Sequence, residues 1–254
     1  MPARRTIVLT GVTGKFGLIL CEHFLSSGDI VIGTARSQTA LHMLESAMRD
    51  GTDNFHGIAV DFMTAQSVGQ FCDAIASRGI RPDCLVNNAR SLDFLSVPED
   101  GVVRRQDFCN EYLMDVVIPY ELTMKLALQK HSQLKRVVNI GSQYGVVAVN
   151  PNLYDAPDNQ SPIQYSVAKA ALMHLTKELA VRLARQKIQV NCVAFGGVRG
   201  RVDAQFEQRY AGLCPTGRML DDDDIAGPVD ALLSDGNGAI TGQTLVADGG
   251  WSLW

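Results

Sequence analysis

Tyr165 and Lys169 stand four positions apart in the segment SPIQYSVAKAALMHLTKELAVRLARQ. Apolar residues recur along this segment at helical spacing, so it predicts an amphipathic helix over 162–186. Side chains four apart on a helix share one face. An ammonium held beside a phenol lowers the pKa of that phenol. The pair therefore predicts a tyrosine that protonates an alkoxide and takes the proton back in the reverse reaction.

The start of this helix carries capping signals. Ser161 is predicted as the N-cap, Pro162 as the first helical residue, and Gln164 as the partner that completes a capping box. These signals would fix the reactive pair in the first turns of the helix.

A second group of residues with chemical meaning is the stretch IVLTGVTGKFGLIL at 7–20. Gly11 predicts a tight turn after a strand, Gly14 leaves room for a pyrophosphate, and Gly17 lets the next helix pack against the sheet. The free N–H groups and positive dipole end of that helix would face the phosphates. The stretch predicts a dinucleotide-binding turn, with a tight turn that binds nothing as the alternative.

Cofactor choice depends on the end of the second predicted strand, GTARSQ. An acid there commonly binds the ribose of NAD, but this chain has Ala35, Arg36 and Ser37. A guanidinium binds phosphate through two N–H groups, so Arg36, with added charge from Lys15, favours NADP(H) over NAD(H). The alternative is that both cations are simply solvated. Asp61, after the third predicted strand, would accept from the adenine amino group or cap a helix.

The elements that must position these residues alternate along the chain. Strands are predicted at 6–10, 30–35, 55–60, 84–88, 136–141, 188–195 and 244–248. Helices are predicted at 15–27, 37–49, 64–78, 105–131, 162–186 and 222–234. This rhythm predicts an α/β fold, a Rossmann-like doubly wound parallel sheet of about seven strands with helices on both faces. With no linker or repeat, 1–254 is predicted to be a single NAD(P)-binding domain.

Two connections, 89–104 and 143–161, are longer than this fold needs. Both follow the carboxyl ends of strands, where open α/β sheets bind ligands. The 146–160 loop is rich in polar residues, namely Asn150, Asn152, Tyr154, Asp155, Asp158 and Asn159. Sites built to read hydroxyls reject analogues that lack them. The loop therefore predicts a polyhydroxylated substrate, with a solvated loop that has no substrate role as the alternative.

Composition limits the classes of function. The chain has 254 residues, 46% hydrophobic and 20% charged, with a net charge of −4, which is typical of a soluble globular protein without a nucleic-acid partner. No apolar run is long enough to cross a membrane, and glycines break the stretch after the N-terminal arginines, which therefore predicts a strand and not an export signal. The six scattered cysteines predict reduced thiols in the cytoplasm.

Two further segments predict local features. LDDDDIAG at 220–227 predicts acids at a helix start and not a calcium site, so no metal is expected. The terminal GGWSLW would expose aromatic side chains, which predicts a subunit contact in a homodimer or homotetramer.

Taken together, the motifs resemble the short-chain dehydrogenase/reductase family from end to end. The matching stretches are TGVTGKFG, NNA at 87–89, IGS at 140–142, YSVAK at 165–169, IQVNCVAFGG at 188–197, PTGRM at 215–219 and TGQTLVADGGW at 241–251. The resemblance implies a Rossmann-type oxidoreductase that moves a hydride between a nicotinamide and a carbonyl carbon. By that likeness Tyr165 is the proton donor and acceptor, and Lys169 binds the nicotinamide ribose. Ser142 would hydrogen-bond the substrate oxygen, and Asn87 would lie under the adenosine half of the cofactor.

The chain departs from the family pattern at several positions. The glycine turn reads TGxxGxxG, the spacing of the longer, extended branch. Arg90 replaces a usual glycine and is either a surface residue or a contact to phosphate or an anionic substrate. Asp115 stands where the family commonly has an asparagine that holds a proton-relay water. AFGGVRG replaces a proline–glycine stretch, so Val198 would offer its backbone groups to the carboxamide.

These considerations give two sets of candidates. The catalytic candidates are Ser142, Tyr165, Lys169 and Asp115. The cofactor-binding candidates are Gly11, Gly14, Lys15, Phe16, Gly17, Arg36, Ser37, Asp61, Asn87, Ala89, Tyr165, Lys169 and Val198.

The predicted function is an NADP(H)-dependent oxidoreductase acting on a ketone or secondary alcohol of a polar, sugar-like small molecule. The 146–160 loop and the Ser142–Tyr165 spacing resemble members found with bacterial surface-sugar and flagellin-glycan pathways. One alternative is a reductase of 3-oxoacyl thioesters on acyl carrier protein or coenzyme A. Another is a non-catalytic NAD(P)-binding scaffold or regulator, which the departures at Arg90, Asp115 and Phe195 would suit.

Overall fold

The computed structural model describes residues 4–48, 52–200 and 202–254. Within these ranges one parallel sheet has the strand order β3-β2-β1-β4-β5-β6-β7. The strands are β1 (Thr6–Leu9), β2 (Ile30–Ala35), β3 (Phe55–Ala59), β4 (Cys84–Asn87), β5 (Arg136–Ser142), β6 (Gln189–Phe195) and β7 (Thr244–Ala247). The chain reverses direction across the sheet between β3 and β4, which leaves a switch point at β1 and β4. The predicted doubly wound parallel sheet is confirmed.

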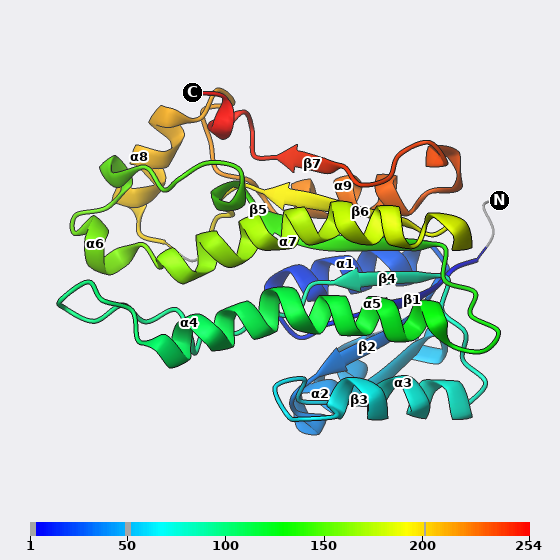
Figure 1. Ribbon diagram of the computed structural model, residues 1–254. Helices are drawn as coiled ribbons and strands as arrows, with labels where there is room; N and C mark the ends of the chain where they lie inside the picture. The colour runs from blue at the N-terminus through cyan, green and yellow to red at the C-terminus, as the bar shows by residue number, and fades with distance from the viewer. Residues whose placement is uncertain (1–3, 49–51, 201) are drawn as a thin grey trace.

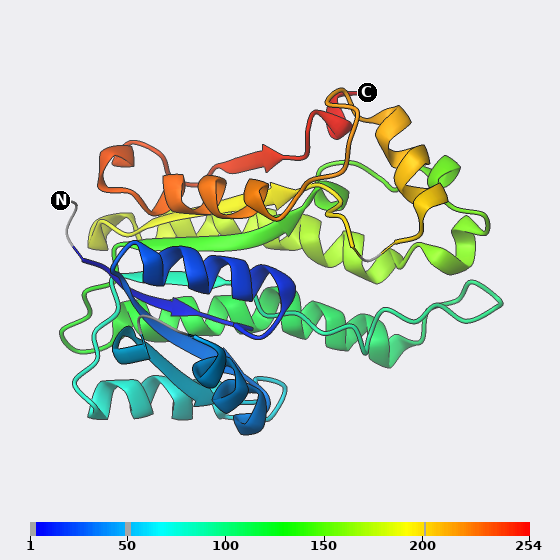
Figure 2. The same cartoon turned by 180° about the vertical axis from the view of Figure 1, so that it is seen from behind.

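Helices cover both faces of this sheet. They are α1 (Lys15–Ser26), α2 (Gln38–Ala47), α3 (Ser67–Ser77), α4 (Arg105–Tyr112), α5 (Ile118–Leu128), α6 (Pro157–Gln160), α7 (Ile163–Arg182), α8 (Ala204–Leu213) and α9 (Asp223–Leu233). Figure 1 shows α3, α4, α5 and α7 in front of the sheet, and Figure 2, the view from the opposite side, shows α1, α2 and α9 on the other face. None of the helices in the described ranges combines the length and apolar character that crossing a bilayer needs.

Shorter turns complete the architecture. A π-helical turn at Leu113–Val117 joins α4 to α5, so the helix predicted at 105–131 is three consecutive pieces. Single 3₁₀ turns lie at Thr52–Asn54, Gln143–Gly145, Pro151–Leu153, Ala184–Gln186, Asp235–Asn237 and Trp251–Leu253. The last residue of the helix predicted at 37–49 lies outside the described residues, and α9 begins among the acids of 220–227 as predicted.

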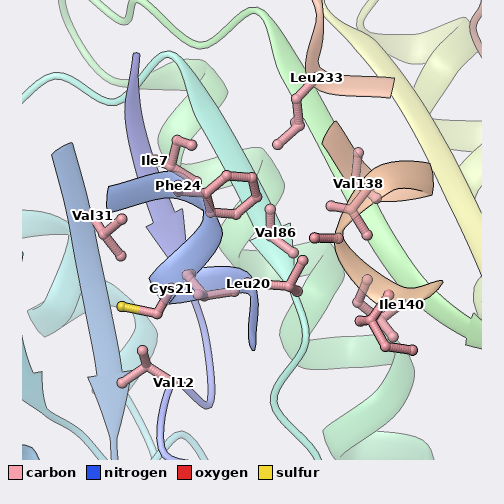
Figure 3. Close-up of a cluster of buried hydrophobic side chains, with 14 of the residues drawn as sticks. Ile7, Val12, Leu20, Cys21, Phe24, Val31, Val86, Val138, Ile140 and Leu233 are labelled. Carbon is pink, nitrogen blue, oxygen red and sulfur yellow. The ribbon is translucent and has the colours of Figure 1, made fainter. Parts of the chain in front are cut away.

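Each face of the sheet has its own apolar core. Ile7 and Leu9 pack toward α1, where they meet Phe24, while the intervening Val8 packs toward α5 and α7 on the opposite face. Figure 3 shows part of the first core, with Phe24 close to Ile7 and Leu20. Because helices cover both faces of the middle of the sheet, an inner strand such as β1 has consecutive buried apolar residues, whereas the edge strand β7 exposes Leu245 and Val246. The two cores hold the carboxyl ends of the strands in a fixed arrangement.

The capping prediction for α7 is wrong. The helix begins at Ile163, with Pro162 at the N-cap position and no side-chain cap. The Ser161 hydroxyl donates to Pro157 O at 2.6 Å, because it closes the short α6 turn instead. Gln164 reaches out of the helix and donates to Phe94 O at 2.8 Å. The start of α7 is therefore fixed by contacts with distant segments and not by a local capping box.

A third cluster of buried side chains lies between α8 and the C-terminal segment. Figure 1 shows these elements on the left. The members of this cluster are Leu153, Tyr210, Cys214, Met219 and Trp251. Trp251 is 4% exposed and stacks on Tyr210 with ring centroids 5.6 Å apart. The expectation that GGWSLW exposes its aromatics is therefore wrong for Trp251 and holds for Trp254, which is 77% exposed.

Candidate active site

A cavity of about 650 Å³ lies at the carboxyl ends of the strands, beside the switch point. Most of the predicted site residues line it, namely Gly11, Gly14, Lys15, Phe16, Gly17, Arg36, Asp61, Ala89, Ser142, Tyr165, Lys169 and Val198. Ser37, Asn87 and Asp115 are not part of its lining. We call the part near Arg36 and Asp61 the adenosine end, and the part near Ser142 and Tyr165 the catalytic end.

The glycine turn is built as a cradle at the start of α1. Gly11 has φ +68°, and a Cβ there would stand 2.7 Å from Ala89 Cα, so no other residue fits. A Cβ on Gly14 would meet only Gly11 O, at 3.5 Å, and would otherwise stand in the cavity. The first N–H groups of α1 lack helical partners and carry the positive dipole end. The turn thus fits a pyrophosphate.

Gly17 has a different role from the predicted one. A Cβ at this position would stand 2.7 Å from Val12 Cα and would also overlap Gly11 O. The glycine therefore lets α1 close onto its own preceding turn, and not onto the strands of the sheet.

The two cations predicted to select NADP(H) both have carboxylate partners. Lys15 Nζ donates to Arg199 O at 2.5 Å and lies 2.8 Å from Asp222 Oδ1, so it ties the glycine turn to the start of α9. Arg36 lies 2.9 Å from Asp93 Oδ2 and is 62% exposed. The Ser91 hydroxyl and then Arg36 lower the pKa of Asp93 below its ordinary value. Arg36 alone remains at the surface of the adenosine end.

Two other adenosine-end candidates have local roles. The Ser37 hydroxyl accepts from Ala40 N and caps α2, away from the cavity. Asp61 lines the cavity, but its Oδ1 accepts from Met63 N at 3.0 Å in a turn, and α3 begins only at Ser67. The reading of Asp61 as a helix cap is wrong, because the turn separates it from the helix.

Asn87 points into the protein. Its amide donates to Asn139 Oδ1 at 2.8 Å between β4 and β5. The next residue, Asn88, lines the cavity instead, and its amide donates to Thr10 O at 2.8 Å. The motif NNA therefore predicted the cavity-lining asparagine to within one residue. The alternating direction of side chains along a strand decides which of the two asparagines faces the cavity.

The three family-type residues meet at the catalytic end. Ser142 ends β5, and its Oγ accepts from Tyr144 N at 3.2 Å, which leaves its own O–H to donate elsewhere. Lys169 Nζ donates to Ile140 O at 3.0 Å and lies 5.6 Å from the centroid of the Tyr165 ring. A serine hydroxyl, a phenol and an ammonium thus share one wall of the cavity.

Asp115 lies behind that wall, as the buried counter-ion of Lys169. Its Oδ2 is 3.0 Å from Lys169 Nζ, and both side chains are almost fully buried. Burial by itself would lower the pKa of Lys169, but the Asp115 carboxylate raises it above its ordinary value. Asp115 is carried by the π-helical turn, a feature that occurs often at functional sites. The ion pair keeps the ammonium charged and in place.

Glu111 is a buried carboxyl that the sequence did not single out. Neither of its oxygens has a hydrogen-bond partner among the described residues. Burial, reinforced by Asp115, raises the pKa of Glu111 from 4.5 to about 7, although Lys169 and Arg90 oppose the shift. The available signal was its position four residues before Asp115, on the same helical face.

We expect Glu111→Gln to remove a pH-dependent loss of stability. The raised pKa means that the folded state binds this proton more tightly than the unfolded state, so stability falls from pH 4.5 to about 7 and stays low above it. The full effect is on the order of 3 kcal/mol. Urea unfolding should show the variant more stable than the wild type at pH 8, with a much smaller difference at pH 5. Equal differences at both pH values, or a matching change in the exposed control Glu22→Gln, would contradict this.

Aromatic residues close the catalytic end. Tyr144 and Tyr154 both line the cavity, with their hydroxyl oxygens 3.3 Å apart. Of the six polar residues of the 146–160 loop, only Tyr154 reaches this lining. Asn150 caps its own turn, and Asp155 pairs with Arg209 at 2.8 Å. These polar groups therefore hold the loop in place and do not face the cavity.

Val198 has its backbone groups available. It forms a bridge with Leu220 in which Leu220 N donates to Gly197 O and Arg199 N donates to Leu220 O. This pattern does not use the N–H and C=O of Val198 itself. The position suits the predicted contact to a carboxamide.

A doubly wound sheet, a glycine cradle and a serine–tyrosine–lysine wall in one cavity define a nucleotide-dependent oxidoreductase of the Rossmann class. Residues 16–252 match the family model described as enoyl-(acyl carrier protein) reductase. Since this match covers most of the chain and agrees with the end-to-end motifs, the chain belongs to the short-chain dehydrogenase/reductase family. It is an oxidoreductase of that family.

Several known proteins are similar to this chain over nearly their whole length. Post-translational flagellin modification protein A of Campylobacter coli is 27% identical over 258 residues, covering 100% of both chains. The 3-oxoacyl-[acyl-carrier-protein] reductase FabG of Aquifex aeolicus is 28% identical over 258 residues, covering 96% of this chain and 95% of that protein. A short-chain dehydrogenase from Leptospira borgpetersenii with bound NAD⁺ matches with a TM-score of 0.86 and 27% identity, covering 99% and 94% of the two chains. These similarities support a nicotinamide dinucleotide as the cofactor.

Proposed function

We propose that this chain is an NADP(H)-dependent oxidoreductase that acts on a ketone or secondary alcohol of a polar, sugar-like substrate. The observation that carries the proposal is the common wall formed by Ser142, Tyr165 and Lys169, in a cavity that also contains the glycine cradle. The likeness to a flagellin modification protein favours a substrate of a surface-modification pathway.

The residues of the chain have distinct roles in this reaction. The glycine cradle and Val198 would hold the dinucleotide. When bound, the dinucleotide would supply the hydride that is transferred to the carbonyl carbon. The Ser142 O–H donates a hydrogen bond to the carbonyl oxygen, and the Tyr165 O–H gives its proton to that oxygen as negative charge develops. Lys169, held by Asp115 and Ile140 O, keeps a positive charge near the phenol and so favours the phenolate that remains.

The preference for NADP(H) rests on Arg36. No carboxylate stands at the end of β2, and the Arg36 guanidinium lies exposed on the cavity wall. A 2′-phosphate would replace Asp93 as its partner, since both are anions that bind two N–H groups. Lys15 contributes little to this preference because Asp222 already neutralises it.

Titration of the protein with both cofactors tests this assignment. We expect NADPH to bind about 10-fold more tightly than NADH, and Arg36→Gln to remove most of that difference. Asp93→Asn should strengthen NADPH binding, because it removes a competing carboxylate. The exposed control Arg78→Gln should change neither affinity. Tighter binding of NADH by the wild type would contradict the assignment.

A reductase of 3-oxoacyl thioesters is the second candidate. The cavity wall includes apolar side chains that an acyl chain could contact, namely Leu92, Leu95, Val149, Val202 and Phe206. The similarity to FabG favours the same reading. Steady-state rates with acetoacetyl-coenzyme A and with polyhydroxylated ketones separate the two candidates. Binding of NADPH without turnover of any carbonyl compound would instead favour a non-catalytic protein.

A further inference from the structure

Arg90 lies directly beside the reactive tyrosine. It follows β4, is exposed, and lines the cavity. Its guanidinium carbon is 5.2 Å from the centroid of the Tyr165 ring, about as close as Lys169 Nζ at 5.6 Å. Arg90 is thus at the catalytic end, whereas Arg36 is at the adenosine end. Whatever Arg90 binds must lie next to the reacting carbonyl.

The backbone on both sides of Arg90 is fixed. Ala89 N donates to Thr10 Oγ1 at 2.9 Å, which ties the segment to the end of β1. Four residues after Arg90, Phe94 O accepts from Gln164 Nε2 at 2.8 Å. Gln164 immediately precedes the reactive tyrosine on α7. The backbone that carries Arg90 is therefore fixed relative to α7, and its guanidinium lies over the Tyr165 ring without a ligand, which reduces the entropic cost of a contact.

Arg90 also has no carboxylate to neutralise it. The other three cations of the cavity lining pair with acids: Lys15 with Asp222 at 2.8 Å, Arg36 with Asp93 at 2.9 Å, and Lys169 with Asp115 at 3.0 Å. Within the described part of the chain, no carboxylate lies within 4.0 Å of the Arg90 guanidinium. The lining carboxylates, Asp61 and Asp93, are at the adenosine end. The catalytic end therefore carries one uncompensated positive charge.

The buried Glu111 interacts with Arg90 from behind the wall, but it does not cancel this charge. Its pKa is raised to about 7, mainly by burial, so that much of it is neutral near neutral pH. Asp115, the other acid nearby, is already paired with Lys169. An anion that enters the cavity meets Arg90 without a strong competitor.

From this arrangement we infer that Arg90 binds a substrate carboxylate a few bonds away from the reacting carbonyl, so that the substrate is a polyhydroxylated keto acid or hydroxy acid. The inference rests on the proposed oxidoreductase function and narrows its substrate class. A guanidinium presents two parallel N–H groups to the two oxygens of a carboxylate. One uncompensated cation balances a monoanion, whereas a phosphate dianion would keep an unbalanced charge. The Tyr144 and Tyr154 hydroxyls on the same wall are placed to bind substrate hydroxyls.

The kinetic test pairs each of several polyhydroxylated keto acids with its neutral amide. We expect Arg90→Gln to lower kcat/KM for the acids about 10- to 100-fold and to leave kcat/KM for the amides within about 3-fold. The control Arg105→Gln removes an exposed arginine outside the cavity and should change neither value. An equal loss for acids and amides would overturn the inference.

A binding measurement separates this inference from the proposed function. Calorimetry of the enzyme–NADP⁺ complex should show gluconate binding more tightly than the neutral polyol sorbitol, and Arg90→Gln should weaken gluconate about 10- to 100-fold without changing NADP⁺ affinity. If no compound is turned over, the proposed function fails, but this loss of gluconate binding would still support a carboxylate site. Equal gluconate affinity in the wild type and Arg90→Gln, or tighter binding of inorganic phosphate than of gluconate, would overturn the inference.

Discussion

Replacing Tyr165 by phenylalanine is expected to lower kcat about 10²- to 10⁴-fold, the range that a positioned general acid contributes. Phenylalanine keeps the ring that lies near Arg90 and Lys169, so the cavity wall should keep its shape. Only the O–H that protonates the substrate oxygen is lost. The measurement is kcat at saturating substrate, together with the Kd of NADPH from fluorescence titration, which we expect to be unchanged.

Tyr154→Phe is the matched control for this experiment. Tyr154 also presents a hydroxyl to the cavity, but from the 146–160 loop and not from α7. Its loss should raise KM for a hydroxylated substrate while kcat changes less than 10-fold, because it removes uniform binding and not a proton donor. Turnover that survives in Tyr165→Phe would show that another group is the acid.

Asp115→Leu is expected to lower the free energy of unfolding by about 3–5 kcal/mol, the cost of leaving a buried charge without its partner. The Lys169 ammonium would keep only the bond to Ile140 O. Because the pKa of Lys169 is higher in the folded than in the unfolded protein, the charged lysine stabilises the fold. This stabilisation is fully present below pH 10.5, the ordinary pKa of lysine, and is lost only as the pH rises through the pKa of Lys169 in the folded protein. In a Glu111→Gln background, urea unfolding should therefore give the same loss at pH 6 and at pH 8. With Glu111 present the loss should be smaller at pH 8, because Asp115 also repels the ionised Glu111.

The double variant Asp115→Leu/Lys169→Met separates charge from packing. It removes both members of the ion pair and leaves apolar side chains, so it should be more stable than Asp115→Leu alone. The single variant Lys169→Met completes the double-mutant cycle. It should also lower stability, because it leaves the buried Asp115 carboxylate without its partner. A double variant whose loss equals the sum of the single losses would show that the two residues are not coupled.

The strands could be predicted because their sequence pattern is local. Ile7, Val8 and Leu9 in β1, and Val137 and Val138 in β5, are consecutive apolar residues that are at most 1% exposed, as expected for strands covered on both faces. The glycine turn and the YSVAK helix follow such strands at the expected spacing. The candidate site could be placed at the carboxyl ends of the strands for the same reason.

Features that depend on distant contacts could not be predicted. The ion pairs Lys15–Asp222 and Arg36–Asp93 join residues far apart in the chain. Helix α8 was missed because its apolar side chains pack on the separate cluster around Trp251 and not on the sheet. Asn88 lines the cavity in place of the predicted Asn87, because the direction of each side chain at the end of β4 decides which asparagine faces the cavity.

The π-helical turn explains the inward position of Asp115, which a regular helical period does not give. In a regular α-helix over 105–131, each side chain would follow the last by the same rotation about the helix axis. The wider π-helical turn at Leu113–Val117 changes this rotation, so the residues in and after it point in other directions. Asp115 is thereby turned toward Lys169 in the interior. A hydropathy pattern read at constant period assigns such residues to the surface.

The stacking of Trp251 on Tyr210 gives the protein an internal optical probe. The chain has two tryptophans, and both lie in its last four residues. Trp254 is exposed, so iodide can quench its emission selectively, while Trp251 remains shielded. The Tyr210 hydroxyl donates to Gln143, which lines the cavity beside Ser142. We therefore expect the shielded emission to change when a substrate reaches the catalytic end, so that binding can be followed spectroscopically without any attached label.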